Sequence, residues 1–321
     1  MNSPELKREY EAARGELALF DVDRTVLSVE GPTRQKFLHN VLSNDIASLA
    51  EGQGVLAALM DVKGHQVAWL RALVVKDRVL LELPSSRTDV VEAQLNHYRV
   101  AAPVRFTRPN SAVMAVIGPR AVEVLQSLLH MAVGELPSEG HRAAAQFPAG
   151  EVRVVRATDM PLQGYVLIGP AEALTMLRQQ LLAGTATEIS RTTLDALRIE
   201  DGIPWYGPDV TEANLLHEAG LVRLYHSPTK GCYVGQENVA RLEARGGHVN
   251  KALRGLRLGA PAAAGDPITA EGAEVGRVTT AAVSPRLGPI AMGYVHRSRL
   301  EPGTAVEVGG VTANVTALPL V

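Results

Sequence analysis

Between Gly31 and His97, the apolar positions change from a helical period to short extended runs. After Gly31-Pro32, where proline suits a first helical turn, apolar residues recur at helical spacing: Phe37, Leu38, Val41 and Leu42. Polar turns then separate three apolar runs: 55–60, 66–75 and 78–83. This pattern predicts an antiparallel meander, which a helix over 86–97 closes.

A strand pattern, a Gly-Pro pair and a helix pattern follow one another twice in the middle of the chain. They span 113–129 around Gly118-Pro119 and 165–182 around Gly169-Pro170. Glycine permits a tight exit from a strand, and proline presets the first turn of a helix. We interpret both as ordinary junctions, which favour an α+β core of split βαβ-like units with antiparallel sheets.

A further helix is predicted over 192–201, and the chain is then irregular and polar through His248. Long irregular stretches inside compact proteins tend to be functional. Beyond Lys251, short Val-rich runs alternate with Gly, Pro and Thr, and five are strand candidates: 254–258, 274–280, 289–295, 305–308 and 312–317. A small closed β-barrel of about 70 residues accounts for them.

These patterns divide the chain into three predicted domains. Residues 1–50 and 111–250 form a discontinuous α+β domain, residues 51–110 form a meander-plus-helix domain, and residues 251–321 form the barrel. The polar residues 1–16 are either a short lead-in helix or a frayed arm.

The composition narrows the function classes. The 321 residues are 46% hydrophobic and carry a net charge of −2, so the whole chain does not attract nucleic acid or anionic lipid. The first residues lack the apolar run of a signal peptide, and Arg71 interrupts the apolar stretch around it. We therefore expect a cytoplasmic protein with no membrane partner.

Cys232 is the single cysteine of the chain. One thiol cannot close an intrachain disulfide or fill a four-thiolate metal site, so we expect no metal site built by this chain alone. Motifs for nucleotide binding, zinc proteolysis and serine hydrolysis are also missing from the sequence.

The segment Lys230–Glu237, K-G-C-Y-V-G-Q-E, surrounds that cysteine with two glycines. If the backbone is extended, Lys230 and Cys232 point to the same side, and an ammonium beside a thiol lowers the pKa of the thiol. Alternatively, Cys232 is a small buried hydrophobe in a turn. The residues themselves leave both interpretations open.

Glu200 ends the predicted helix over 192–201, where a carboxylate opposes the helix dipole. It either serves a ligand or is a solvated surface carboxylate. Arg241 and Arg245 could share a helical face that binds RNA, but a solvated basic face is the favoured interpretation, so direct nucleic-acid binding is not expected.

The segment Lys230–Glu237, followed by Val239-Ala240-Arg241, resembles the signature of the YgfZ-type folate-binding proteins, relatives of the glycine-cleavage aminomethyltransferase. The resemblance also covers other segments: Ser43-Asn44-Asp45-Ile46, Ile117-Gly118-Pro119, Leu197-Arg198-Ile199-Glu200 with Gly202 and Pro204, and the closing barrel. It implies a central opening of folate size that binds tetrahydrofolate. It also implies a role in iron–sulfur cluster assembly or repair beside assembly or client proteins, with an indirect role in tRNA modification.

The resemblance also assigns roles to residues. Lys230 and Cys232 match the functional pair of the signature and are the candidate catalytic residues. Glu200 matches the carboxylate that contacts the pterin ring, a task that suits a group able to accept two N–H bonds. The candidate cofactor-binding residues are Glu200, Asn44, Tyr233, Gly231, Gly235, Gln236 and Arg241.

One departure from the relatives concerns the second strand of the meander. Ala68 and Trp69 stand where the aminomethyltransferases carry acids, and neither side chain can take a proton or hold a cationic amine. This argues against the glycine-cleavage reaction and leaves the question of an enzyme activity open. The alternative to an accessory role is a folate-dependent one-carbon transferase or a demethylase-like enzyme.

Overall fold

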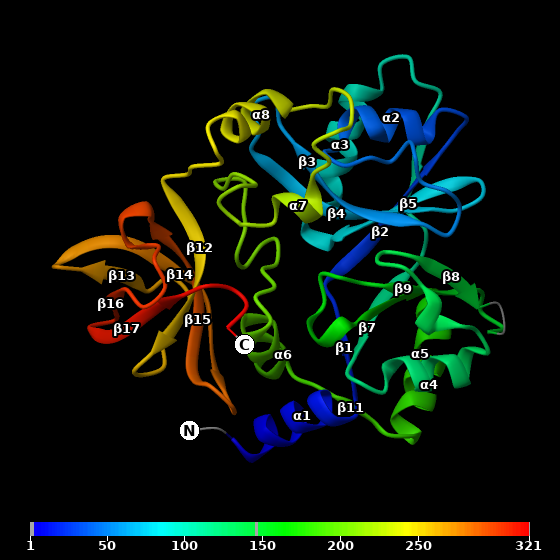
Figure 1. Ribbon diagram of the computed structural model, residues 1–321. Coiled ribbons are helices and arrows are strands. Elements are labelled where there is room, and N and C mark those ends of the chain that lie inside the picture. Colours follow the sequence, from blue (N-terminus) through cyan, green and yellow to red (C-terminus); the bar gives the residue numbers. More distant parts are fainter. Residues whose placement is uncertain (1–2, 145–146, 321) are drawn as a thin grey trace.

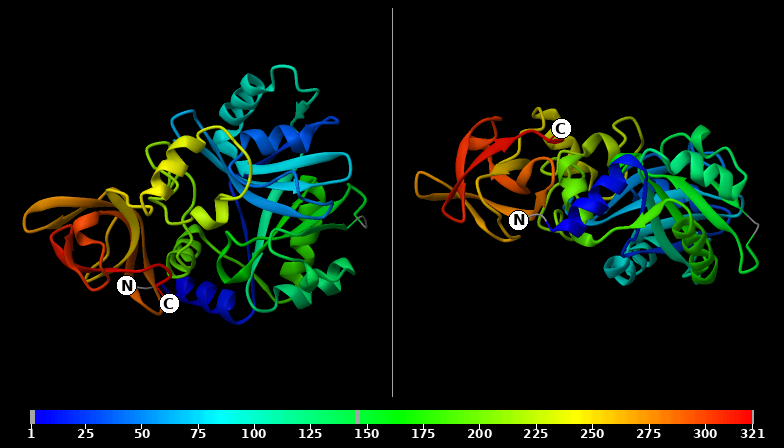
Figure 2. Two further views of the ribbon diagram at one scale, coloured as in Figure 1. Left: turned by 45° about the horizontal axis from the view of Figure 1, so that its top comes forward. Right: turned by 90° about the horizontal axis from the view of Figure 1, so that it is seen from below.

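The computed structural model describes residues 3–144 and 147–320 (Figure 1). Two α+β units lie on one side of helix α6 (Arg191–Glu200), and a β-barrel lies on the other. A second view along another axis keeps the barrel apart at one end of the molecule (Figure 2). The α+β fold with a closed C-terminal barrel is the predicted one.

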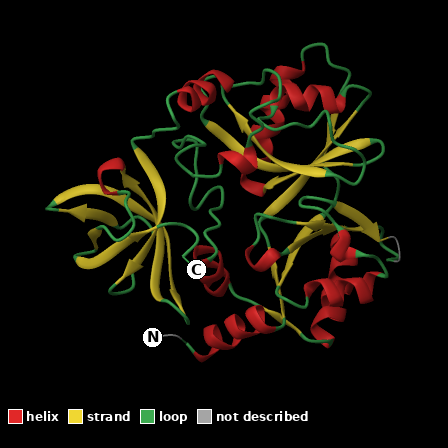
Figure 3. Cartoon of the chain, viewed as in Figure 1, coloured by secondary structure: helices red, strands yellow, loops and turns green. Residues whose placement is uncertain are grey.

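The first unit is a six-stranded sheet in the order β11-β1-β7-β10-β9-β8. Its pairs are antiparallel except for β1 with β11. The helices α4 (Ala121–Leu129) and α5 (Ala171–Ala183) cover its outer face (Figure 3). The strands are β1 (Leu17–Asp21), β7 (Ala112–Ile117), β8 (His141–Ala144), β9 (Val152–Arg156), β10 (Tyr165–Gly169) and β11 (Ala186–Glu188).

The second unit is a five-stranded antiparallel sheet in the order β3-β4-β5-β2-β6, covered by α2 (Arg34–Val41) and α3 (Thr88–Arg99). Its strands are β2 (Arg24–Glu30), β3 (Gly54–Met60), β4 (Gln66–Val74), β5 (Arg78–Pro84) and β6 (Arg105–Thr107). The predicted meander is β3, β4 and β5. Because β2 pairs with β5 and β6, residues 24–30 share a sheet with the meander, although the predicted boundary at residue 50 places them in the other domain.

The barrel closes in the order β12-β15-β14-β13-β16-β17. Five strands match the predicted runs: β12 (Lys251–Leu258), β14 (Ala273–Ser284), β15 (Gly288–His296), β16 (Ala305–Val308) and β17 (Val311–Thr316). The sixth strand, β13 (Pro267–Ala270), was not predicted. It has four residues, begins with proline and shifts register against β14, so its apolar pattern is too short to recognise.

The remaining helices join the three parts. Residues 4–15 form helix α1 (Pro4–Gly15) rather than a frayed arm, and the Ser3 hydroxyl caps it by accepting the Leu6 N–H at 3.1 Å. The stretch expected to be irregular contains α7 (Val222–Tyr225) and α8 (Gln236–Ala244). Short 3₁₀ helices complete the chain: η1 (Ser85–Arg87), η2 (Val133–Glu135), η3 (Pro161–Gln163) and η4 (Arg297–Arg299). Over 3–144 and 147–320, none of the helices has the length and apolar character to cross a membrane.

His141 lies where β8 meets the five-stranded unit. Its backbone N–H donates to the carbonyl of Gly52 at 2.9 Å, and its Nδ1 lies 2.9 Å from Nη1 of Arg153. Burial, and then the Arg153 guanidinium, lower the pKa of His141 from 6.5 to about 4. The imidazole is therefore neutral near pH 7 and accepts a hydrogen bond from Arg153.

Acidification is expected to destabilise the protein through His141. An unfolded chain takes up this proton near pH 6.5, whereas the folded protein does so only near pH 4, so stability falls as the pH drops through this window. The loss is on the order of 3 kcal/mol. Urea unfolding at several pH values should show that loss for the native chain. The amide of the His141→Gln variant does not titrate, so the stability of this variant should fall by about 3 kcal/mol less over the same pH range. If plots of unfolding free energy against pH run parallel for the two proteins, the assignment to His141 is contradicted.

Candidate functional site

A cavity of about 580 Å³ opens where the two sheets meet the start of α6. Segments far apart in the sequence line it: the β1–β2 turn, β4, the ends of β5 and β11, the loop after β9, and the irregular stretch after α6. The lining residues are Phe20, Asp21, Val22, Asp23, Arg24, Trp69, Pro84, Ser86, Asp159, Met160, Glu188, Ile189, Arg191, Leu194, Pro204, Trp205, Tyr206, Gly207, Pro208 and Tyr225.

Aromatic side chains form much of the cavity wall. Trp69 of β4 stacks on Tyr225 of α7 with 4.4 Å between ring centroids and 27° between ring planes. Tyr206 meets the Trp69 ring edge-on at 6.4 Å, and Trp205 lines the cavity as well. Both tryptophans of the chain therefore face one cavity, although only 4% of the residues are aromatic. Flat walls of this kind suit a planar ring system.

A buried cluster of charges lies beside this aromatic wall. Arg24 contacts Glu82 through Nε at 2.5 Å and Asp159 through Nη1 at 2.9 Å. Arg71 is fully buried and ion-pairs with three carboxylates at once: Glu82, Glu139 and Asp159. Arg24 and Asp159 also line the cavity, so the cluster reaches its surface.

The cluster holds three carboxylates against two guanidinium groups. Burial raises the pKa of Asp159, but Arg71 and Arg24 outweigh that effect and keep the pKa below its usual value. For Glu82, burial dominates and raises the pKa. Asp159 is thus an ionised acceptor at the cavity surface.

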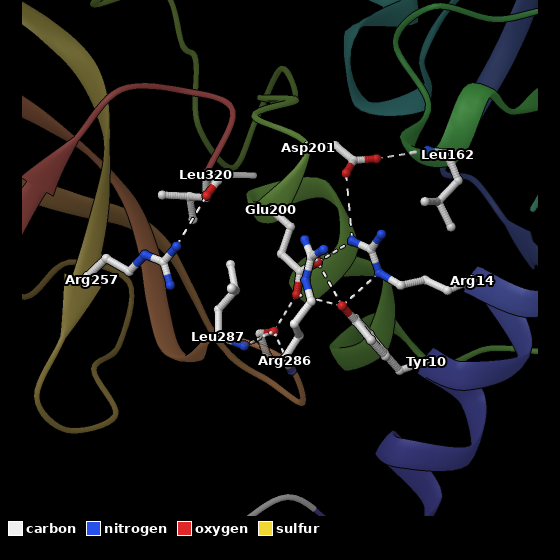
Figure 4. Close-up of polar contacts among 10 residues, drawn as sticks. Tyr10, Arg14, Leu162, Glu200, Asp201, Arg257, Arg286, Leu287 and Leu320 are labelled. Carbon is white, nitrogen blue, oxygen red and sulfur yellow. Dashed lines mark hydrogen bonds and ion pairs between the residues drawn. The ribbon is translucent and has the colours of Figure 1, made fainter.

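Glu200 lies outside the cavity, in a different polar cluster (Figure 4). Its side chain is fully buried, so it is not a solvated surface carboxylate. The Tyr10 hydroxyl donates to both of its oxygens, at 2.8 and 3.0 Å. Further donors are Arg14, Ser284 and Arg286. These contacts join α1, the end of α6 and the barrel hairpin, so Glu200 fastens α1 and the barrel to α6.

Lys230 and Cys232 lie apart from the cavity as well. The Lys230 ammonium donates to the carbonyls of His39 and Leu42 at the end of α2, where a cation complements the helix dipole. It also lies 4.7 Å from the ring centroid of Tyr233, and burial lowers its pKa to about 8. Cys232 is exposed, so the interpretation as a buried hydrophobe is wrong. Among the hydrogen bonds and ion pairs of the described chain, none joins Lys230 to Cys232.

Gly235 packs the same segment against the meander, and Gln236 closes a turn within the segment. Gly235 has φ 82° directly before α8, and a Cβ there would lie 2.5 Å from the carbonyl oxygen of Asp61. The side-chain oxygen of Gln236 accepts the Tyr233 N–H at 3.2 Å and closes the turn. The second glycine of the motif therefore serves close backbone packing.

Replacing Gly235 by alanine is expected to lower the free energy of unfolding by about 1–3 kcal/mol, because the left-handed backbone and the Asp61 contact both oppose a Cβ. The matched control is Gly231→Ala, since no atom lies within 4 Å of the Cβ that it would add. Urea unfolding of both variants measures the difference. Equal losses would show that the backbone at Gly235 is not constrained in this way.

The side chains of Asn44 and Tyr233 also contact other residues of the protein. The Asn44 amide donates to the carbonyls of Leu56 at 2.8 Å and Leu224 at 3.1 Å. Tyr233 is buried in the same apolar cluster as Trp69 and Tyr225, which line the cavity. Gly231 and Arg241 are exposed.

Comparison of the chain with known protein families identifies the family to which it belongs. The chain matches the family described as GCVT N-terminal domain over residues 2–227, and the Glycine cleavage T-protein C-terminal barrel domain over residues 251–321. It belongs to the glycine cleavage T-protein family. The two matched regions correspond to the pair of α+β units and to the closed barrel.

Several named proteins are similar to it along most of their length. It is 28% identical to an aminomethyltransferase of Synechocystis, covering 94% of this chain and 84% of the relative. It is 29% identical to an aminomethyltransferase of Cutibacterium acnes, covering 97% and 88%. A putative chloroplastic transferase of Arabidopsis thaliana is 27% identical over 88% of this chain, which spans 66% of that relative. The crystal structure of aminomethyltransferase T from Bartonella henselae has the same fold, with a TM-score of 0.89 at 23% identity over 100% of this chain and 91% of that one.

None of the nine site residues predicted from the sequence is among the described residues that line the cavity of this T-protein family member. Ala68 is buried in the core of the five-stranded unit, whereas its neighbour Trp69 lines the cavity. The sequence reasoning missed Arg24, Asp159 and the aromatic residues after α6. The sequence did contain a signal for two of these residues. Trp205 and Tyr206 are adjacent aromatic residues in the irregular stretch, and the chain has few aromatic residues.

Proposed function

We propose that this T-protein family member binds tetrahydrofolate in the cavity beside Trp69. The observation that carries the proposal is the aromatic wall, where both tryptophans face a cavity of about 580 Å³ that also exposes the charged pair Arg24 and Asp159. A reduced folate carries a flat ring with polar edges, which matches flat walls and buried polar groups. Membership of a family with aminomethyltransferase relatives supports the same ligand.

Titration calorimetry with tetrahydrofolate tests this proposal. Trp69→Ala is expected to weaken binding by about tenfold or more, because truncating an aromatic wall removes both area and stacking. Val62→Ala is the control, since Val62 is 74% exposed on the β3–β4 turn and lies outside the cavity. Absence of binding by the native chain would overturn the proposal.

For the biological role, we propose an accessory function in iron–sulfur cluster assembly or repair, as in the YgfZ-type proteins, with an indirect effect on tRNA modification. The exposed Cys232 supports it, because the single thiol of the chain is open to a partner protein. Trp69 supports it too, since its indole lines the cavity and cannot exchange a proton in a transfer reaction. The partners are then iron–sulfur assembly or client proteins, and the cytoplasmic location stays a prediction.

The second candidate is a folate-dependent one-carbon transferase or a demethylase-like enzyme. The aminomethyltransferases of similar length favour it, and it fits these relatives at least as well as the accessory role does. Incubating the purified protein with tetrahydrofolate and a series of aminomethyl donors, whose one-carbon unit is already at the oxidation level of formaldehyde, separates the two. Formation of methylenetetrahydrofolate over many turnovers favours the enzyme, and folate binding without turnover favours the accessory protein.

A further inference from the structure

None of the described residues of the barrel lines the cavity, yet the barrel contacts the turn that carries Trp205. Residues 205–210 form this turn, and Asp209 closes it. The Oδ2 of Asp209 accepts the Trp205 N–H at 3.0 Å, and the backbone N–H of Asp209 donates to the Trp205 carbonyl at 3.0 Å. Both backbone polar groups of Trp205 are therefore bonded to one residue, so the place of the indole in the cavity wall depends on Asp209.

The carboxylate of Asp209 is held from the side of the barrel. It is buried, with 2% of the residue exposed. Its Oδ1 accepts the hydroxyl groups of Thr279 and Thr280 of β14, each at 2.7 Å. Its Oδ2 accepts Nη1 of Arg198 as well as the Trp205 N–H. Four donors fill the four acceptor sites of the carboxylate, which leaves it a single orientation.

The two threonines reach one carboxylate because β14 is irregular at this point. Successive side chains of a regular strand point to opposite faces of the sheet. The pairing of β14 with β15 shifts register between Val278 and Thr280, so Thr279 is the extra residue of a β-bulge, which re-aims its side chain. The Thr279 hydroxyl also lies 3.1 Å from the Met292 carbonyl, but the charged Asp209 is nearer and is the stronger acceptor.

The Trp205 indole contacts the same group of residues. Arg198 is fully buried in α6, and its guanidinium carbon lies 5.4 Å from the centre of the indole ring. The same guanidinium donates to the Thr280 hydroxyl at 2.8 Å. On the cavity side, Nε1 of Trp205 donates to the carbonyl of Asp159 at 3.3 Å. A shift of Asp209 would therefore move both the Trp205 backbone and the arginine beside its ring.

We propose that Asp209 is a positioning residue for the cavity wall and that the bulge at Thr279 couples the barrel to it. The barrel fixes the Asp209 carboxylate, Asp209 fixes the Trp205 backbone, and the indole then forms one wall against which a ring ligand packs. Asp209, Thr279 and Thr280 do not line the cavity themselves, so they act on the ligand through Trp205. The ligand is that of the proposed folate site, on which this inference rests.

Removing the two hydroxyl groups tests the coupling by titration calorimetry. The double variant Thr279→Val and Thr280→Val keeps the size of both side chains. It should bind tetrahydrofolate about fivefold more weakly or worse, because the wall is no longer held in place. The double variant Thr279→Ser and Thr280→Ser keeps both hydroxyl groups and should stay within about twofold of the native affinity. Thr312→Val is the matched control, because Thr312 is an exposed threonine on β17 of the same barrel.

Tryptophan fluorescence separates positioning from a general loss of stability. The chain has two tryptophans, so Trp69→Phe leaves Trp205 as the reporter and Trp205→Phe leaves Trp69. The valine pair should shift the emission of Trp205 and increase its quenching by acrylamide, while the signal of Trp69 stays unchanged. An unchanged Trp205 signal, equal changes in both reporters, or native affinity of the valine pair would overturn the proposal. A native chain that binds no tetrahydrofolate would overturn the folate site instead, and the two reporters would then decide the role of Asp209.

Discussion

Replacing Arg71 by methionine is expected to lower the free energy of unfolding by about 3–5 kcal/mol. Arg71 is fully buried and is the group that Glu82, Glu139 and Asp159 share. Without it, three carboxylates remain in the interior with Arg24 as the nearest guanidinium in the cluster. Urea unfolding at pH 7 measures the effect, with folate titration alongside to show whether Asp159 loses its orientation.

Arg105→Met is the matched control for Arg71. Arg105 pairs with Glu30 at the edge of the five-stranded sheet but is 73% exposed, so its loss should change stability by less than about 1 kcal/mol. Adding Glu139→Gln to Arg71→Met should restore part of the lost stability, because one uncompensated charge is removed. Equal losses in the two arginine variants would contradict a central role for the buried cluster.

Replacing Cys232 by serine is expected to abolish rescue of iron–sulfur enzyme activity in a strain that lacks this protein. Serine keeps the size of the side chain, but its hydroxyl stays protonated near neutral pH, whereas a thiol yields the thiolate that reacts with metals and sulfur. Cys232 is exposed and is the single cysteine of the chain, so no other thiol can replace it. Enzyme activities in extracts, with the protein level measured in parallel, give the readout.

Thr229→Ser is the control for Cys232, because Thr229 is exposed and lies three residues earlier, directly before the same segment. It should rescue fully. Full rescue by Cys232→Ser at a normal protein level would exclude thiol chemistry and would favour the one-carbon transferase as the function. Loss of rescue with native folate affinity would separate the role of Cys232 from that of the cavity.

Much of the fold could be predicted because its elements have strong local patterns. The meander of β3, β4 and β5 follows from three apolar runs between polar turns, and α4 and α5 follow from their Gly-Pro starts. Strand β13 and helices α7 and α8 were not predicted, and each lacks a recognisable local signal. Strand β13 and helix α7 have four residues each, and α8 begins at a left-handed glycine rather than at a capping side chain.

The candidate site was less predictable than the fold. The motif around Cys232 is contiguous, and its residues do lie together, yet Lys230 contacts α2 instead of the thiol. Glu200 has the residue type that a pterin contact needs, but its donors come from α1 and the barrel. The hydrogen-bond partners of Lys230 and Glu200 are distant in the chain, so the sequence around each residue cannot reveal them.

The sequence by itself determined many of the secondary-structure elements, the α+β class with a closed C-terminal barrel and the resemblance to the T-protein family, because each depends on residues close together in the chain. Only the tertiary structure decided which side chains share the cavity. Trp69, Asp159 and Trp205 come from separate segments and meet because two sheets pack against the start of α6. Neighbouring charges then decided the chemistry of Asp159, since Arg71 and Arg24 keep this carboxylate ionised although burial raises its pKa.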